Sequence, residues 1–177
     1  DLEAKEHTIY LYDVGSGARE TFYQLRDPRH LRPDWQVDWA PADDGLIILT
    51  DRDGWLHLYH QRNAGEPPHQ ITQGEWEIES FAVDGTTKSL YFTANKSHLA
   101  DRQIYRVPAA GGEVERVSGS ASGTHQPVYS PDFSRIADWY SSDTMPPELF
   151  VIDTDRPREA TRVTRSPQPE FYDQTWA

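Results

Sequence analysis

The sequence predicts an all-β fold made of β-propeller blades, each blade being a sheet of four antiparallel strands. The first observation behind this prediction is a short motif that recurs along the chain. It reads Ile-Tyr-Leu-Tyr-Asp at residues 9–13 and recurs in related form at 56–60, 104–108 and 149–153. The four starts lie 47, 48 and 45 residues apart, and a period of about 40–50 residues is typical of propeller blades.

The second observation is that the recurring segments are apolar on both faces. Successive side chains of a strand point to opposite faces, so Ile9 and Leu11 share one face while Tyr10 and Tyr12 share the other. A blade packed between two neighbours needs such strands, whereas a two-layer sandwich, the alternative fold, exposes one face of each sheet. The third observation is composition, because 13 Pro, 11 Gly, nine Tyr and six Trp suit a turn-rich β-protein.

The remaining strands of each blade are found around the recurring motif. Runs of aliphatic, β-branched or aromatic residues precede it at 45–50, 89–93 and 135–141, as expected of strands. Tight turns containing Asp-Gly or Pro-Asp, such as residues 40–45 and 130–133, come directly before these runs. Each predicted blade therefore contains the strands and turns of an antiparallel meander.

These strands divide the chain into blade pieces. Residues 8–25 supply the last two strands of one blade, residues 35–72, 76–118 and 125–165 form three complete blades, and residues 170–176 begin another. Residues 1–177 are thus predicted to form one partial β-propeller, with about three complete blades plus two incomplete ends. Propellers close with about four to eight blades, so these pieces do not close a ring.

Composition and charge exclude several classes of function. A formal net charge of −12 would repel a phosphate backbone, so we expect no nucleic-acid partner. No apolar run is long enough to span a bilayer, so we expect no membrane segment. The absence of cysteine excludes disulfides and thiolate chemistry, and the sequence does not predict a cellular compartment.

The sequence predicts neither a metal site nor a cofactor. His57 and His60 are three residues apart, so in a strand they point to opposite faces and one ion cannot bind both. Residues 51–54, Asp-Arg-Asp-Gly, resemble the start of a calcium loop, but Trp55 stands where a third oxygen ligand is needed. A hairpin between two strands is the preferred interpretation of this segment.

Aromatic residues offer a further alternative, a sugar-binding array. Trp39, Trp55, Trp76 and Trp139 recur at equivalent or nearly equivalent places in the blades, so we predict that they pack in the core and between blades. Trp35 and Trp176 are left without a predicted role.

Two neighbouring segments resemble a known family. Residues 51–59, Asp-Arg-Asp-Gly-Trp-Leu-His-Leu-Tyr, followed by 70–77, Gln-Ile-Thr-Gln-Gly-Glu-Trp-Glu, resemble the propeller of dipeptidyl peptidase IV-type serine peptidases of the prolyl oligopeptidase clan. Residues 90–94, 104–108 and 140–147 agree with this resemblance, which extends from about Arg29 to the end of the chain.

The resemblance implies a place in a larger protein. In this family an eight-bladed propeller precedes an α/β-hydrolase domain, and residues 166–171 resemble the stretch that leaves the last blade. This chain would then be the C-terminal half of the propeller, with earlier blades before Asp1 and the hydrolase domain of the same parent chain after Ala177. The implied function is to gate access to the hydrolase and to help shape the pocket for a peptide substrate.

The family's catalytic residues are not expected in this chain. The catalytic serine of the family lies in a Gly-x-Ser-x-Gly elbow, and residues 119–123, Gly-Ser-Ala-Ser-Gly, have Ala121 at the position of the nucleophile. The Glu-Glu pair that binds the substrate amine in family members belongs to earlier blades. We therefore predict no catalytic residue here.

One loop is a candidate for substrate contact through the same resemblance. Residues 29–33, Arg-His-Leu-Arg-Pro, join two predicted blades, and the matching family segment faces the substrate pocket. Arg32 would contact a carbonyl or carboxylate of the substrate, and Leu31 would offer an apolar contact. The alternative is a solvated basic loop beside an acidic domain.

Other functional classes remain open at this point. The chain could be a stand-alone propeller module that binds a protein partner without enzymatic activity. A glycosidase-type propeller is a weaker alternative, because the turns lack a repeated Asp-box pattern. Finally, the incomplete ends suggest a homodimer in which two chains, head to tail, complete one ring and cover their edge strands.

Overall fold

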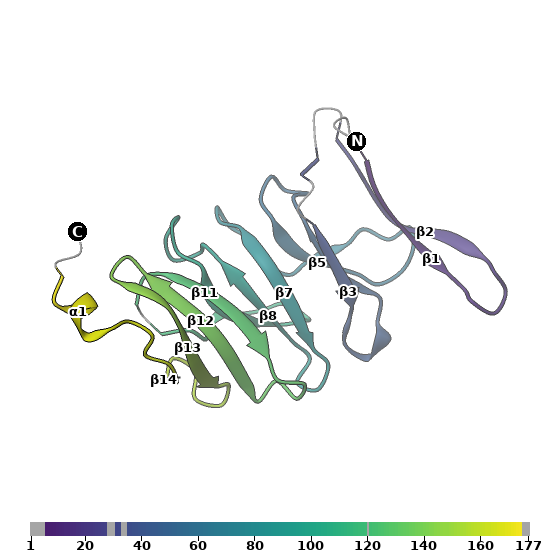
Figure 1. Cartoon of the computed structure of the whole chain (residues 1–177). Helices are drawn as coiled ribbons and strands as arrows, with labels where there is room; N and C mark the ends of the chain where they lie inside the picture. The colour runs from purple at the N-terminus through teal and green to yellow at the C-terminus, as the bar shows by residue number, and fades with distance from the viewer. Residues whose placement is uncertain (1–5, 28–30, 33–34, 120, 175–177) are drawn as a thin grey trace.

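The computed structural model describes residues 6–27, 31–32, 35–119 and 121–174 (Figure 1). Its strands form four antiparallel sheets, each in chain order. The N-terminal hairpin consists of β1 (Glu6–Tyr12) and β2 (Arg19–Arg26). Sheet I consists of β3 (Gln36–Trp39), β4 (Leu46–Thr50), β5 (His57–Gln61) and β6 (His69–Gln70). Sheet II consists of β7 (Ile78–Asp84), β8 (Ser89–Ala94), β9 (Gln103–Pro108) and β10 (Glu115–Arg116). Sheet III consists of β11 (Thr124–Tyr129), β12 (Arg135–Ser142), β13 (Met145–Asp153) and β14 (Ala160–Arg162).

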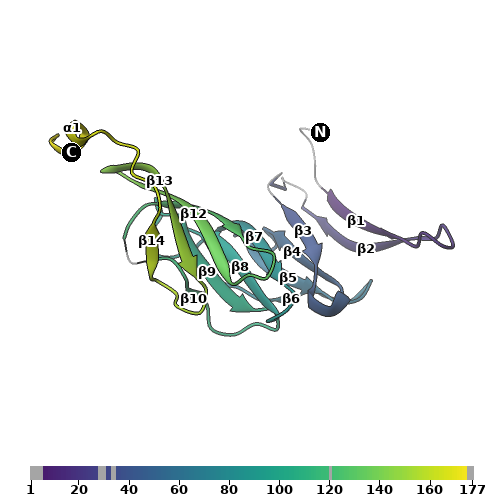
Figure 2. The same cartoon turned by 60° about the horizontal axis from the view of Figure 1, so that its bottom comes forward.

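The predicted fold class, a partial propeller of four-stranded antiparallel blades, is confirmed. The sheets follow one another in a row, with the hairpin and sheet III at opposite ends (Figure 1). Figure 2 shows β6 and β10 on the side of the row away from β3 and β7. Neighbouring sheets are in contact, since β7 touches β3 and β4, and β11 touches β9.

The hydrophobic core lies in the layers between successive sheets. The layer between the hairpin and sheet I contains Phe22, Tyr23, Leu46 and Ile48. The largest layer joins sheets I and II and includes Ile47, Leu49, Leu58, Ile78, Leu90, Phe92 and Tyr105. The layer between sheets II and III contains Tyr91, Ile104, Val117, Ile136 and Ile152. Strand β4 contributes to two layers because all five of its residues are buried, as the two-sided apolar pattern requires.

Local turns are stabilised by their own side chains. In the turn between β11 and β12, Asp132 Oδ1 accepts hydrogen bonds from Ser130 Oγ at 2.7 Å and from Ser134 Oγ at 2.8 Å. The backbone N–H of Ser134 donates to the same oxygen at 3.1 Å. These bonds, first that from Ser130, lower the pKa of Asp132 to about 2 because they favour the charged carboxylate.

The structure corrects the alignment of the recurring motif. The amides of Ile71, Val117 and Val163 donate to the carbonyls of Leu58, Ile104 and Leu149, respectively. The structural equivalent of Ile104 and Leu149 is thus Leu58, whereas the sequence pattern placed Leu56 there. Leu56 and Leu58 are two residues apart and belong to the same core layer. A two-residue shift therefore leaves the apolar pattern unchanged.

The C-terminal end also differs from the prediction. Residues 170–176 were expected to begin another blade, but α1 (Pro169–Tyr172) is a short helix within this stretch, and residues 175–177, including Trp176, lie outside the described part. Pro169 occupies the first turn of the helix, where its fixed φ and missing N–H are tolerated, whereas a strand would lose a ladder hydrogen bond. No described helix has the length and apolar character needed to cross a membrane.

The two ends of the row leave apolar side chains exposed. Tyr10 and Tyr12 of the hairpin are 47% and 66% exposed, and sheet III exposes Val128 and Trp139 by 65% and 45%. Four Trp residues were predicted to pack in the core and between blades. Trp76 is buried at 8% exposed, whereas Trp39, Trp55 and Trp139 are exposed by 55%, 37% and 45%. Trp139 is exposed because no further sheet covers that face among the described residues.

Candidate functional site

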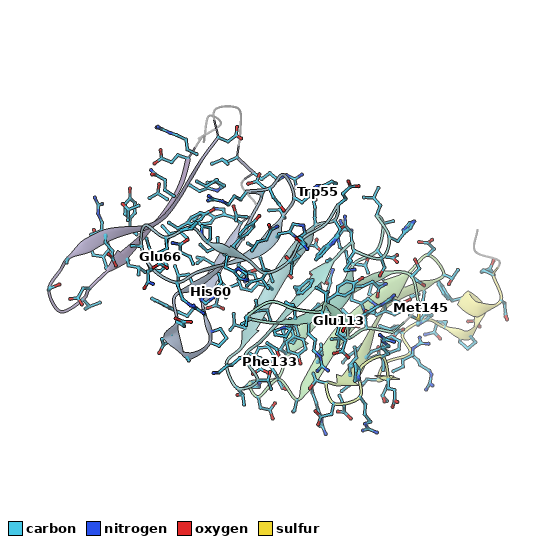
Figure 3. All side chains as sticks on the ribbon, turned by 180° about the vertical axis from the view of Figure 1, so that it is seen from behind. Trp55, His60, Glu66, Glu113, Phe133 and Met145 are labelled. Carbon is cyan, nitrogen blue, oxygen red and sulfur yellow. The ribbon has the colours of Figure 1, made fainter. Side chains whose placement is uncertain are left out.

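At the same end of each sheet lie both the loop between the second and third strands and the segment that passes from one sheet to the next. In an antiparallel meander, the loop between the second and third strands lies at the end where the chain also passes to the next sheet. Figure 3 shows Trp55, from the loop between β4 and β5, near the upper edge of the molecule and Phe133, from the turn between β11 and β12, near the lower edge. We call the end that carries Trp55 and the sheet-to-sheet connections the mouth.

Arg32 lies at the mouth and is held by acidic residues of sheet I and its exit. Its Nη1 is 2.5 Å from Glu77 Oε1, and the exposed fractions of the two side chains are 42% and 27%. The backbone N–H of Arg32 donates to Asp51 Oδ2 at 3.4 Å. Leu31 beside it is only 3% exposed. The rest of the predicted substrate loop, namely Arg29, His30 and Pro33, lies outside the described residues.

Glu77 lies in the segment that connects sheet I to sheet II, and its backbone is fixed by a hydrogen bond to the residue that follows β8 of sheet II. Its backbone N–H donates to Asn95 Oδ1 at 2.7 Å, and the preceding Trp76 is buried. The Trp76 ring stacks on Phe92 with centroids 6.0 Å apart and meets His57 edge-on at 4.7 Å. The guanidinium of Arg32 is thus positioned by the Glu77 carboxylate, which follows the buried Trp76 directly in the chain. The sequence did not indicate this arrangement.

A polar cavity of about 590 Å³ opens at the mouth between sheets II and III and includes Asp101, Ser122 and Tyr140 in its lining. Asp101 Oδ1 accepts hydrogen bonds from Ser122 Oγ at 2.6 Å and from the Gly123 N–H at 3.1 Å. Burial opposes the charge, but these bonds outweigh it and lower the pKa of Asp101. Tyr140 Oη donates to the Ser122 carbonyl at 2.7 Å. These contacts join the connection before β11 to sheets II and III.

Comparison with known proteins identifies the family. The sequence profile of the dipeptidyl peptidase IV N-terminal region matches residues 3–147. The chain belongs to this family. "Probable dipeptidyl peptidase 4" of Aspergillus fumigatus is 27% identical over 121 residues, which are 65% of this chain and 15% of that protein. Dipeptidyl peptidase 4 of Arthroderma otae is 30% identical over 95 residues, 53% of this chain and 12% of that protein.

A solved structure has the same fold. The crystal structure of Porphyromonas gingivalis dipeptidyl peptidase 4 superposes with a TM-score of 0.77 at 21% identity, covering 90% of this chain and 23% of that chain. The chain therefore spans about a quarter or less of the length of these relatives, within the N-terminal region for which the family is named.

In a dipeptidyl peptidase IV family member, a His–Asp pair invites comparison with a catalytic triad. His125 Nδ1 is 2.6 Å from Asp138 Oδ2, and both side chains are buried. The Tyr140 ring stacks on His125 at 4.5 Å. Within the described residues, however, His125 Nε2 is buried without a hydrogen-bond partner. No described hydroxyl is therefore placed beside His125 Nε2 to serve as a nucleophile. The His125–Asp138 pair instead joins strands β11 and β12 of sheet III.

The residues considered for metal binding have other partners in this family member. His57 contacts Thr72 Oγ1 through Nδ1 at 3.1 Å and the Gly74 carbonyl through Nε2 at 2.9 Å. His60 Nε2 instead lies 2.5 Å from the Asp44 carbonyl, in the turn between β3 and β4. Asp53 accepts hydrogen bonds from the Trp55 N–H at 3.2 Å and from Gln70 Nε2 at 2.6 Å. Within the described ranges, no group of three or more His, Asp or Glu side chains is arranged for a metal ion.

Proposed function

We propose that this chain is a non-catalytic propeller segment of a dipeptidyl peptidase-like serine peptidase. It would cover a hydrolase domain of the same parent chain, gate the entry of peptides and help shape the substrate pocket. The observation that carries the proposal is the pair of uncovered apolar ends: Tyr10 and Tyr12 at one end, Val128 and Trp139 at the other. Both ends would be covered if further blades continued the row, and membership of the family supports this arrangement.

The coding DNA beyond codon 177 provides the direct test. A Gly-x-Ser-x-Gly elbow, followed by Asp and His in that order, is the expected result. A stop codon soon after Ala177 would contradict the proposal and favour the stand-alone module that binds a protein partner.

Within this function, we assign substrate contact to Arg32. Its side chain is 42% exposed at the mouth, and a guanidinium matches the carbonyl or carboxylate groups of a peptide. An apolar substrate contact was predicted for Leu31, but its side chain is only 3% exposed, so we propose that it anchors the loop instead. Glu77 would hold the guanidinium in position.

Replacing Arg32 with alanine in the parent peptidase should raise KM for a peptide substrate by at least about tenfold, because a hydrogen bond to a charged group contributes about 1.5–3 kcal/mol. The value of kcat should change by less than about twofold, since the contact is made equally in the ground and transition states. Glu77→Gln should raise KM by a smaller factor. Steady-state kinetics with a dipeptide amide checks these values.

Arg62→Ala is the matched control for this measurement. Arg62 also pairs with a carboxylate, Asp44, at 2.9 Å and is 62% exposed, but it lies at the end of sheet I opposite the mouth. If Arg32→Ala and Arg62→Ala change KM equally, substrate contact by Arg32 is wrong.

For the chain by itself, we propose that a second copy covers the exposed ends. Burial of two apolar faces favours association, so sedimentation velocity should show dimers that dissociate on dilution. Trp139→Lys should shift the population to monomers, whereas Leu99→Lys should not, because Leu99 is 79% exposed but lies in the loop between β8 and β9. An unmodified chain that stays monomeric at about 100 µM would contradict the homodimer.

A further inference from the structure

Each four-stranded sheet buries a polar side chain at an equivalent place in its third strand. These side chains are His57, Gln103 and Glu148, and each is 0% exposed. They are followed directly by Leu58, Ile104 and Leu149, the three equivalent positions defined above. The proposed function assigns no role to any of them. Complete burial of a polar group is costly unless it is hydrogen-bonded, so their partners are informative.

The three side chains contact the same kind of partner, a hydroxyl that follows the fourth strand. His57 lies 3.1 Å from Thr72 Oγ1, Gln103 Oε1 accepts from Ser118 Oγ at 2.7 Å, and Glu148 Oε2 accepts from Thr164 Oγ1. The same three hydroxyls accept the amides of Leu58, Ile104 and Leu149 at 3.0, 3.1 and 2.9 Å. We call each buried side chain, with its hydroxyl, an exit clamp.

Each exit clamp also binds the backbone of the segment that leaves its sheet. His57 Nε2 lies 2.9 Å from the Gly74 carbonyl, and Gln103 Nε2 donates to the Ala121 carbonyl at 2.9 Å. In sheet III the direction is reversed, because the N–H of Ser166 donates to Glu148 Oε1 at 2.6 Å. A carboxylate can only accept hydrogen bonds, so this exit must present its N–H rather than its carbonyl.

The exit clamp of sheet III contains a carboxylate, Glu148, which is contacted by one cationic donor, Arg162, and two neutral donors, Thr164 and Ser166. Arg162 Nη2 of β14 lies 3.3 Å from Glu148 Oε1. Burial opposes ionisation, but the bonds from Thr164, Ser166 and Arg162 outweigh it and lower the pKa of Glu148. Across the sheet, Tyr140 of β12 is opposite Glu148 in the strand register, and His125 of β11 stacks on the other side of Tyr140.

We propose that Glu148 is a charged anchor for the segment leaving sheet III, and that protonation of Glu148 frees this exit while the exit clamp of sheet II, whose Gln103 does not titrate, stays closed. The Thr164 hydroxyl can reverse its role and accept, but the N–H groups of Ser166 and Arg162 that contact Oε1 cannot. A proton on Oε1 must therefore break at least one of these two contacts. The folded-state pKa lies below the ordinary value, so the anchor is complete above about pH 4.5. It is lost as the pH falls through the lower folded-state value.

The test is hydrogen exchange at the Ser166 amide in the 177-residue chain, corrected for intrinsic exchange rates. Glu148→Gln replaces one acceptor oxygen by a donor and should lower Ser166 protection at neutral pH by at least about tenfold, leaving Gly123 protection within about threefold. Gln103→Glu is the matched reverse change. It places a carboxylate against the Ala121 carbonyl and should loosen the exit of sheet II while leaving Ser166 protected.

Titration of the unmodified chain adds a measurement that requires no substitution. Ser166 protection should fall as the pH is lowered below about 4.5, before that of the strand amides of sheet III, and Glu148→Gln should abolish this early step. Unchanged Ser166 protection in Glu148→Gln would overturn the proposal. If that variant unfolds, the titration decides alone: simultaneous loss of protection at Ser166 and in the strands would overturn it. None of these outcomes depends on the presence of a hydrolase domain.

Discussion

Replacing Phe92 with alanine is expected to lower the free energy of unfolding by about 3–5 kcal/mol. Phe92 is 0% exposed, in the second strand of the middle sheet. Its ring stacks on Trp76 at 6.0 Å and on Tyr105 at 5.7 Å, so truncation leaves a cavity in the largest core layer. Because this layer joins sheets I and II, the loss should affect the whole row.

Urea denaturation followed by tryptophan fluorescence measures this effect. Tyr12→Ala is a suitable control, because it also removes an aromatic ring but at a site that is 66% exposed. Its expected effect is within about 0.5 kcal/mol. The measurement should use a dilute sample, in which self-association does not protect Tyr12. A loss below about 1 kcal/mol for Phe92→Ala would show that the layer between sheets I and II contributes little to stability.

Replacing Gly45 with alanine should have the second largest effect, a loss of about 2–4 kcal/mol. Gly45 has a φ of +89°, and a Cβ there would lie 2.2 Å from the Gln61 carbonyl oxygen and 2.8 Å from Arg62 Cα. Both atoms belong to the backbone, so no side-chain rotation relieves the overlap. Backbone strain and overpacking each cost about 1–3 kcal/mol.

Gly54→Ala separates these two contributions. Gly54 also has a positive φ, +98°, but nothing lies within 4 Å of a Cβ placed there. It should therefore cost only the strain, about 1–2 kcal/mol, in the same urea experiment. Equal losses for Gly45→Ala and Gly54→Ala would show that the close approach of the β5–β6 turn to Gly45 is not the cause.

Much of the fold could be predicted from the sequence, since strands that are apolar on both faces, Asp-Gly and Pro-Asp turns and the spacing of the repeat are local properties. The errors also have local causes. Leu56 was aligned in place of Leu58 because a two-residue shift preserves the face of every side chain. A strand was expected at residues 170–176, although Pro169 favours the start of a helix. Trp139 was expected in a core, but its burial depends on a neighbouring sheet.

The candidate site was predictable only in part. The resemblance drew attention to Arg32, but nothing in the sequence connects it with Glu77, which is 45 residues away and is brought near by the packing of consecutive sheets. The exit clamps were missed for a similar reason. His57, Gln103 and Glu148 differ in chemistry, so they show no repeated residue type, and their common role is visible only in their hydrogen bonds.

The sequence by itself determined the fold class, the blade repeat and the family resemblance, because strand alternation and turn chemistry depend on residues near one another in the chain. The tertiary structure alone decided which apolar faces are covered, which acid holds Arg32 and in which direction each exit clamp bonds. These properties depend on groups that lie about 15 to 45 residues apart. Their contact is set by the packing of one sheet on the next and by the need to pair every buried polar atom.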